Sequence, residues 1–312
     1  MQTNYFKDGA NHKSIVESVK NIRKVKNKLI NITVLSENTA PLKGDLIAEC
    51  GLSFLLEVDD FTILFDTGRN ISVCYNAQYL GIDLNKINKI VLSHSHSDHT
   101  GGLREVLMRM YKNKSIEVIA HPDIWVTRFK ISEGKRAKFK GIPFQKDELE
   151  SIGANFSLNS RETWIGDKIV VSGEIPMQTD FEGNNENEEG EKRYILKNNE
   201  YVEDQVADDQ AIFIKSEKGL VIVTGCAHRG IVNTILHARK ITGMNKVYAV
   251  IGGAHLLNAT NERITKTIDF FKEYSIEKIG LCHCTGFKAI SLIYNQFPEK
   301  FLSIYTGTKL ML

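Results

Sequence analysis

Three histidines and one aspartate lie within six consecutive positions of the chain, at His94, His96, Asp98 and His99. The apolar run of residues 89–92 predicts a strand, and two histidines spaced by two project from one side of an extended segment. The aspartate and the third histidine then fall in the turn before a helix. Imidazole nitrogens suit Zn, Fe, Ni or Cu and a carboxylate suits harder ions, so these side chains can serve two adjacent cations. We therefore predict a metal site where this strand ends.

This stretch has the form His-x-His-x-Asp-His, and it resembles the signature of the metallo-β-lactamase-fold superfamily. The resemblance implies an α/β fold, a four-layer αββα sandwich with a one- or two-metal site at one edge. In that superfamily the signature follows a strand pair that ends in an Asp-x-Gly-like turn. Residues 53–58 and 61–65 predict such a hairpin, and Asp66-Thr67-Gly68 follows it at the expected place.

The rest of the chain must position this site and bring further ligands to it. Runs of strand-forming residues predict strands at 29–35, 89–92, 116–120, 168–172, 208–214, 219–223, 246–251, 278–281 and 301–305. Helical spacing predicts helices after the signature and at 72–80, 233–241 and 261–274, with one more before residue 301. Each half of the chain presents histidine-bearing turns at strand ends, as an αββα sandwich requires if loops from both halves meet over one site.

The resemblance also implies metal ligands from the second half of the chain. His283 matches the late histidine of the superfamily, and Cys226 matches an Asp or Cys position by its place after the 208–223 hairpin. The histidine expected before that hairpin is missing, because residues 206–209 are Val-Ala-Asp-Asp. Either His228 supplies an imidazole from a shifted position or Asp209 supplies a carboxylate, and we favour His228.

Other residues near these ligands are expected to play different parts. His255 is expected to face the substrate or support a ligand rather than bind metal. Cys282 and Cys284 alternate with His283 and point away from it in an extended chain, so we expect them to pack in the interior. His121 closes a strand before a proline, and we expect a structural role for it.

Three strings narrow the resemblance, namely Thr-Gly-Cys-Ala-His-Arg-Gly-Ile at 224–231, Gly-Gly-Ala-His-Leu at 252–256 and Cys-His-Cys-Thr-Gly at 282–286. With the signature, they are similar to the subfamily of 7,8-dihydropterin-6-methyl-4-(β-D-ribofuranosyl)aminobenzene-5'-phosphate synthase-like proteins. That name implies a pterin and a ribosyl phosphate. The phosphate suits residues 128–146, where seven basic side chains and one acid could attract an anion over the site. A solvated loop is the alternative for this stretch.

Composition limits the classes of protein to which the chain can belong. With 312 residues and 42% hydrophobic content it can bury a large core, and a single domain is expected. The resemblance implies that residues 29–312 form this domain with the metallo-β-lactamase fold. A net charge of +2 argues against a general polyanion binder, so nucleic acid is not an expected partner. An apolar run long enough to span a membrane is missing. Five cysteines, an odd count, favour a reducing compartment, and we expect a cytoplasmic protein.

Two polar segments are expected to lie outside the catalytic body. Residues 1–28 form a basic extension, in which Ser14-x-x-Glu17 and apolar residues at helical spacing predict a short amphipathic helix. Such a helix would pack on the body of the protein or on a second subunit of a homo-oligomer. The acidic, Asn- and Gly-rich residues 182–191 predict a mobile excursion without chemistry.

The function that these features predict is a binuclear metallohydrolase. A metal-bound hydroxide, held by two divalent cations, would attack a small anionic or phosphorylated substrate, and the subfamily resemblance implies a pterin-related one. Zinc is the preferred metal, with manganese or iron as alternatives. Asp98 would orient the hydroxide, and His255 or basic side chains of 128–146 would contact the leaving anion. A di-iron oxidoreductase and a metal-bearing binding or sensor module without turnover are the two alternatives.

Overall fold

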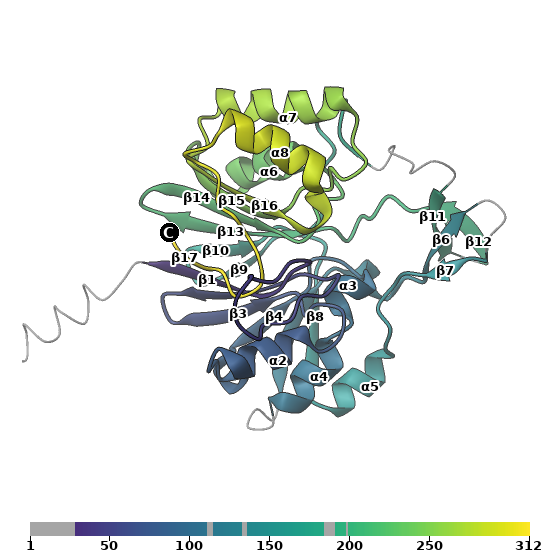
Figure 1. The fold of residues 1–312 in the computed structure, drawn as a ribbon. Helices are drawn as coiled ribbons and strands as arrows, with labels where there is room; N and C mark the ends of the chain where they lie inside the picture. The colour runs from purple at the N-terminus through teal and green to yellow at the C-terminus, as the bar shows by residue number, and fades with distance from the viewer. Residues whose placement is uncertain (1–28, 111–114, 133–135, 184–190, 198) are drawn as a thin grey trace, which may run out of the picture.

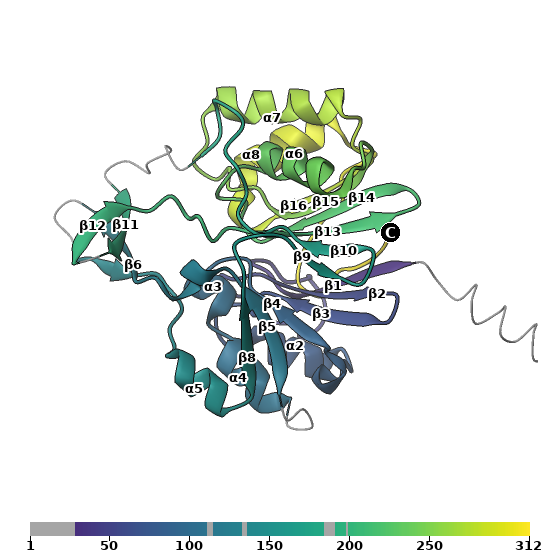
Figure 2. The same cartoon turned by 180° about the vertical axis from the view of Figure 1, so that it is seen from behind.

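The computed structural model describes residues 29–110, 115–132, 136–183, 191–197 and 199–312. Two β-sheets pack face to face, and helices cover the outer surface of each (Figures 1 and 2). The predicted αββα sandwich is therefore confirmed. The first sheet is built mainly from the first half of the chain and the second sheet mainly from the second half, so loops from both halves reach the same edge.

The first sheet has seven strands and contains the predicted hairpin of β2 (Ser53–Val58) and β3 (Phe61–Phe65). The strands lie in the order β17 (Lys309–Met311), β1 (Ile30–Ser36), β2, β3, β4 (Lys89–Val91), β5 (Ile116–Ala120), β8 (Ala154–Leu158). From β3 to β8 neighbouring strands are parallel, so their carboxyl ends meet at one edge. The outer face is covered by helices α2 (Ser72–Tyr79), α4 (Leu103–Arg109) and α5 (Lys146–Ser151) (Figure 2).

The second sheet has six strands, and the three strands on one side of it, β14 to β16, run parallel. The order is β16 (Lys278–Cys282), β15 (Val247–Gly253), β14 (Gly219–Thr224), β13 (Ala211–Ser216), β10 (Ile169–Val171), β9 (Thr163–Ile165). Its outer face is covered by α6 (Ile231–Thr242), α7 (Asn261–Glu273) and α8 (Phe287–Gln296) (Figure 1). Short helical turns complete the chain at η1 (Leu84–Lys86), α3 (Ser97–Thr100), η2 (Pro122–Trp125) and η3 (His283–Thr285).

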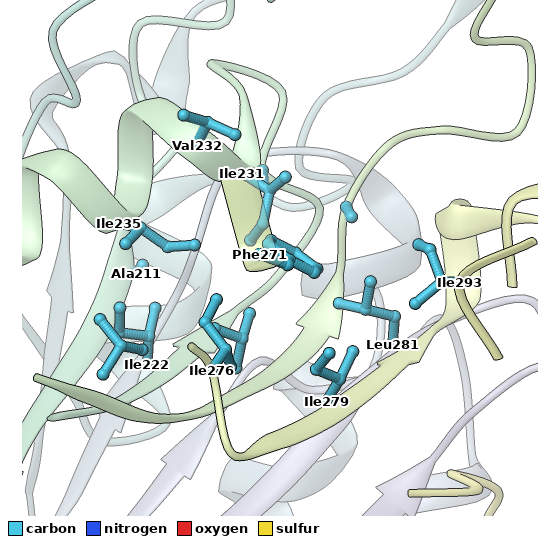
Figure 3. Close-up of a cluster of buried hydrophobic side chains, with 14 of the residues drawn as sticks. Ala211, Ile222, Ile231, Val232, Ile235, Phe271, Ile276, Ile279, Leu281 and Ile293 are labelled. Atoms are coloured by element: carbon cyan, nitrogen blue, oxygen red, sulfur yellow. The ribbon is translucent and has the colours of Figure 1, made fainter. Parts of the chain in front are cut away.

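Three apolar clusters hold the four layers together. One fills the space between the sheets, a second joins the first sheet to α2, α4 and α5, and the third joins the second sheet to α6, α7 and α8. Figure 3 shows the third cluster, in which Ile235 and Phe271 from the helices meet Ile222 and Ile279 from the strands. Fully burying each such side chain contributes about 1.5–3 kcal/mol. This packing makes the strand ends a rigid base for the loops beyond them.

A third, four-stranded sheet projects from the sandwich beside the carboxyl edge of the first sheet (Figures 1 and 2). Its strands lie in the order β12 (Glu200–Glu203), β11 (Glu191–Lys197), β6 (Arg128–Ser132), β7 (Lys138–Phe139). The basic stretch 128–146 thus forms β6 and β7, and not only a loop. We call this element the insertion sheet.

The prediction of a strand at residues 301–305 is wrong. Phe301 makes one isolated bridge to Ile279, and the chain then leaves the second sheet, with the side chain of Ile304 packed in the core between the sheets. It turns back at Gly307, whose φ of +88° lies in the region that favours glycine. Lys309–Met311 then pairs antiparallel with β1 and closes the edge of the first sheet.

The amphipathic helix predicted within residues 1–28 lies outside the described residues, as does most of the acidic segment 182–191. Among the described helices, none combines the length and the apolar character that a membrane crossing requires.

Candidate metal centre

Three imidazoles converge at the end of β4. His94 and His96 follow that strand, and His228 comes from the loop between β14 and α6. His94 Nε2 lies 2.9 Å from His96 Nδ1, and His228 Nε2 lies 3.2 Å from the same His96 nitrogen. All three ring nitrogens lie within 4.8 Å of one another. This is the three-imidazole cluster.

A second cluster of donors adjoins the first. Asp98 Oδ2 lies 3.5 Å from His283 Nε2 and 3.9 Å from His99 Nε2, and His99 Nε2 lies 3.1 Å from Cys226 Sγ. Cys226 Sγ also groups with His94, so the thiol lies at the border between the two clusters. The structure thus brings together every predicted metal ligand, from loops of both halves of the chain.

The protonation of these side chains suits cation binding. Burial lowers the pKa of His94, His96 and His228 well below the usual range of histidine, so these rings are neutral and keep a lone pair for a metal. Burial alone would raise the pKa of Asp98, but the hydrogen bond from His283 and the positive charges of the neighbouring histidines together outweigh it, so this pKa lies well below its usual range and the carboxyl is ionised. Neutral imidazoles and a carboxylate are the forms that bind divalent metals, so the three-imidazole cluster and Asp98 are in the forms that bind cations, whereas His99, whose pKa is raised, would release a proton on binding one.

A buried carboxylate, Asp66, orients the ring of His99. Asp66 lies directly after β3, and its Oδ2 is 2.7 Å from His99 Nδ1 and accepts the hydroxyl hydrogen of Ser93 at 2.7 Å. Burial alone would lower the pKa of His99, but Asp66 outweighs it and raises this pKa to about 9. Because Nδ1 faces the carboxylate, Nε2 faces the donor cluster.

We expect Asp66→Asn to weaken metal binding by about 10–100-fold, the usual effect of removing a carboxylate behind a ligating histidine. The amide nitrogen of asparagine would oppose His99 Nδ1–H and favour the wrong tautomer. Equilibrium dialysis against Zn²⁺ measures the change. Ser53→Ala is the matched control, since Ser53 donates only to the backbone oxygen of Asp66 and leaves its carboxylate in place. Unchanged zinc affinity in Asp66→Asn would contradict this role.

Asp209 serves the loop of His228 and is in none of the donor clusters. Its Oδ2 accepts the backbone N–H of Arg229 at 3.0 Å, and burial raises its pKa to about 7. Between the two alternatives left open by the sequence, the structure therefore places the imidazole of His228, and not the Asp209 carboxylate, beside His94 and His96. Glu182 supports the same loop, because it accepts the N–H groups of Val232 and Asn233 at the start of α6.

The three remaining candidates lie in different surroundings. Cys282 packs in the core between the sheets, as expected. Cys284 does not, because its Sγ lies in the donor cluster with Cys226 and His283. His121 accepts the backbone N–H of Asp123 through Nδ1 and is in none of the donor clusters among the described residues.

Basic side chains of the insertion sheet border the same pocket, which has a volume of about 130 Å³. Lys130, Lys140 and Arg193 line it together with donors from both clusters, namely His96, Asp98, Cys226, His228 and His283, and with His255 and Cys284. Lys130 and Arg193 are directly opposite each other on β6 and β11, where like charges repel. Burial lowers the pKa of Lys140, and the charge of Lys130 lowers it further. This concentration of positive charge favours an anionic ligand above the metal ligands.

His255 connects the insertion sheet to the three-imidazole cluster. Its Nε2 lies 3.3 Å from Arg193 Nη2, and its ring centroid lies 4.1 Å from that of His228. His255 has a φ of +47°, an uncommon conformation for a residue other than glycine, and such strain gathers at functional sites. The position of this ring inside the pocket suits contact with a substrate.

Sequence reasoning missed three residues of this site. The sequence marks Asp66 through the Asp-Thr-Gly turn, but it does not show that the Asp66 carboxylate points at His99. No sequence pattern marks Arg193, because only the pairing of β11 with β6 brings it to the pocket. Cys284 was placed on the wrong side by the assumption of an extended chain.

Comparisons with known proteins agree with this geometry. The model of the metallo-beta-lactamase superfamily matches residues 51–193. A 7,8-dihydropterin-6-methyl-4-(beta-D-ribofuranosyl)-aminobenzene-5'-phosphate synthase of Methanocaldococcus jannaschii is 38% identical over 92% of this chain and 97% of its own length. The crystal structure of Tm1679, described as a metal-dependent hydrolase of the beta-lactamase superfamily, is similar with a TM-score of 0.73 and 28% identity, over 90% of this chain and 98% of that one. The fold alone is shared with YhfI of Bacillus subtilis, at a TM-score of 0.56 and 10% identity over 91% of this chain and 100% of that one.

Proposed function

Because the chain belongs to the metallo-β-lactamase superfamily, we propose that it is a binuclear metal-dependent hydrolase of a small, anionic, phosphorylated substrate. One observation carries this proposal, namely that two adjacent donor clusters open into a pocket bordered by Lys130, Lys140 and Arg193. A pterin-related substrate is supported by the name of the methanogen relative, which contains a dihydropterin and a phosphate.

The two clusters would hold one divalent cation each. The three-imidazole cluster would hold the first, and Asp98, His99 and His283 the second, with Cys226 at their border. Zinc suits this mixture of imidazole, thiolate and carboxylate, with manganese or iron as alternatives. When bound, such a pair of cations lowers the pKa of water and stabilises charge on the group that water attacks.

The side chains around the clusters bind and orient the reactants. Lys130, Lys140 and Arg193 hold the phosphoryl oxygens by charge. The Asp98 carboxylate accepts a hydrogen bond from the attacking water and turns its lone pair towards the phosphorus. The water oxygen forms a new P–O bond as the bond to the leaving oxygen breaks. His255 lies where it can contact that leaving oxygen, which takes up the proton that the attacking water gives up and becomes the free alcohol.

A second candidate function is transfer of the activated group to an acceptor other than water. The methanogen relative is named a synthase, and that name indicates formation of a product and not hydrolysis. The donor clusters and the cationic border would serve this reaction equally well, because both reactions need the same stabilisation of charge. Product analysis with and without an added amine acceptor separates the two candidates.

Elemental analysis of protein purified without added metal is the first test. We expect two equivalents of zinc per chain, and removal of metal with a chelator should abolish hydrolysis of p-nitrophenyl phosphate or its bis-ester. Two equivalents of iron with colour would favour the oxidoreductase alternative. Tight binding of a phosphorylated pterin with no product would favour a binding module. Protein that is active against a phosphoester without any metal would refute the proposal.

The remaining predictions on partners and location follow from the same features. The pocket suits a small molecule, and we propose no nucleic-acid partner. A homo-oligomer remains a prediction that gel filtration with light scattering tests. The free thiols of Cys226 and Cys284 need a reducing compartment to stay free, which supports the cytoplasmic location proposed from the sequence.

A further inference from the structure

Cys284 lies among the donors of the second cluster. Its Sγ groups with Cys226 Sγ and the His283 ring, with all three donor atoms within 4.8 Å of one another. Cys284 is half-buried and lines the pocket together with the basic side chains of the insertion sheet. A thiol in this position is accessible to a small cation that enters the pocket.

The local backbone explains why two successive side chains face the site. β16 ends at Cys282, and the next residue, His283, has a φ of +53°, in the left-handed region. This turn breaks the alternation of an extended chain. His283 and Cys284 can therefore both approach the donors, while Cys282 stays in the core.

A glycine on the neighbouring strand makes room for the sulfur. A Cβ atom at Gly253, the last residue of β15, would lie 2.7 Å from Cys284 Sγ and 2.4 Å from the backbone oxygen of Gly225. Both separations are shorter than van der Waals contact, so a side chain at this position would displace the thiol or the strand end. The sheet thus leaves a space that the sulfur of Cys284 occupies.

The separations suit a common cation. Zinc lies about 2.3 Å from a thiolate and about 2.0–2.1 Å from an imidazole nitrogen, which puts neighbouring ligands of a tetrahedral site roughly 3.3–3.8 Å apart. The donor atoms of Cys226, His283 and Cys284 lie within 4.8 Å, so small rotations of the side chains would bring them to these separations. Thiolates prefer zinc and other soft or borderline cations to Mn²⁺ or Mg²⁺.

We propose that Cys284 is a ligand of the second cation, beside Cys226 and His283, and that this sulfur-rich position selects zinc over manganese. The inference rests on the proposed function, since it requires that the clusters form a metal centre. Ligation by Cys284 makes the two cation positions chemically different, because the first cation would have three imidazole ligands and the second would have thiolate ligands. Metal exchange should therefore proceed at different rates at the two positions.

Reconstitution of the full chain with Co²⁺ tests the ligand directly. Thiolate ligation gives a near-ultraviolet charge-transfer band, which should fall by about half in Cys284→Ser, because one of two thiolates is removed. It should be absent in a Cys226→Ser, Cys284→Ser double variant. Cys282→Ser is the matched control and should leave the band unchanged, because that sulfur packs in the core. An undiminished band in Cys284→Ser with Co²⁺ bound would overturn the ligation of Cys284 and leave the proposed function intact.

Alkylation of the wild-type protein gives an answer that does not depend on the folding of a variant. We expect Zn²⁺ to slow the reaction of Cys284 with iodoacetamide by at least about tenfold, while Mg²⁺ at the same concentration has little effect. Zinc bound in stoichiometric amounts without protection of Cys284 would overturn the inference. Failure of the wild-type protein to bind either Co²⁺ or Zn²⁺ would overturn the proposed function itself, and the inference with it.

Discussion

Replacing His96 by alanine is expected to abolish metal binding and turnover together. His96 Nδ1 lies 2.9 Å from His94 Nε2 and 3.2 Å from His228 Nε2, so its ring is the central member of the three-imidazole cluster. Loss of a residue that merely orients a ligand lowers affinity by about 10–100-fold, and loss of a ligand should lower it by at least the upper value. Elemental analysis and hydrolysis of p-nitrophenyl phosphate, measured on the same sample, check both effects.

A histidine elsewhere in the second half of the chain provides the control. His237 is on α6, where its Nε2 lies 3.3 Å from the backbone oxygen of Ser172, and it is in none of the donor clusters. His237→Ala should keep both metal equivalents and activity. A His96→Ala protein that turns over substrate without metal would remove the metal-centre model.

Replacing Asp98 by asparagine should separate the two metal positions. The carboxylate is 3.5 Å from His283 and 3.9 Å from His99, both in the second cluster, and it is in no group with His94. We therefore expect Asp98→Asn to retain about one equivalent of metal while activity is lost, because the water loses the group that orients it. Loss of both equivalents would show that the two positions fill together.

The signature residues could be predicted because their geometry is local. His94, His96, Asp98 and His99 lie within six positions, so a strand end followed by a turn suffices to bring their side chains together. The hairpin before them was equally local, and β2 and β3 match the predicted residues. These elements have short-range patterns, and the packing of the sandwich does not override them.

The contributions of distant segments could be predicted only in part. The sequence left His228 and Asp209 as alternatives, since a strand end can present either side chain to the site. The turn at Ala227 decides which of the two side chains reaches the site. Its φ of +55° could not be predicted from the sequence. The position of Cys284 was missed for the same reason, because His283 adopts a left-handed conformation that is uncommon outside glycine.

Pairing between distant strands determines which basic side chains border the pocket. The basic stretch predicted as a cap does border the pocket, but Arg193, which pairs opposite Lys130, comes from a segment more than 60 positions away. Arg128, the first residue of that stretch, was expected to attract substrate like its neighbours. It is instead 2% exposed and forms ion pairs with Asp204 and Asp208. A charge count cannot separate a buried structural arginine from one that faces a ligand.

Removing Arg128 should therefore destabilise the protein strongly. Its guanidinium lies 2.6 Å from the Asp208 carboxylate, which in turn accepts the backbone N–H of Ser95, between the first two histidines of the signature. Breaking a buried pair by deleting one partner costs about 3–5 kcal/mol, because the remaining charge is uncompensated. We expect Arg128→Leu to lower the free energy of unfolding by that amount at pH 8, measured by urea denaturation of metal-free protein. Arg104→Leu, which breaks an exposed pair with Glu148, should change it by about 0–1 kcal/mol.

The effect of Arg128→Leu should also depend on pH, in a direction set by Asp208. Burial raises the pKa of Asp208 to about 6, above the usual value of an aspartate, although Arg128 lowers it. A carboxyl whose pKa is higher in the folded state contributes stability below its unfolded pKa and loses it as pH rises through the folded pKa. Without Arg128 the folded pKa rises further, so the variant should lose more stability than the wild type between pH 5 and pH 8. Adding Asp208→Asn should restore part of the loss at pH 8, because it removes one uncompensated charge. A destabilisation that is equal at pH 5 and pH 8 would show that Arg128 acts through packing and not through its charge.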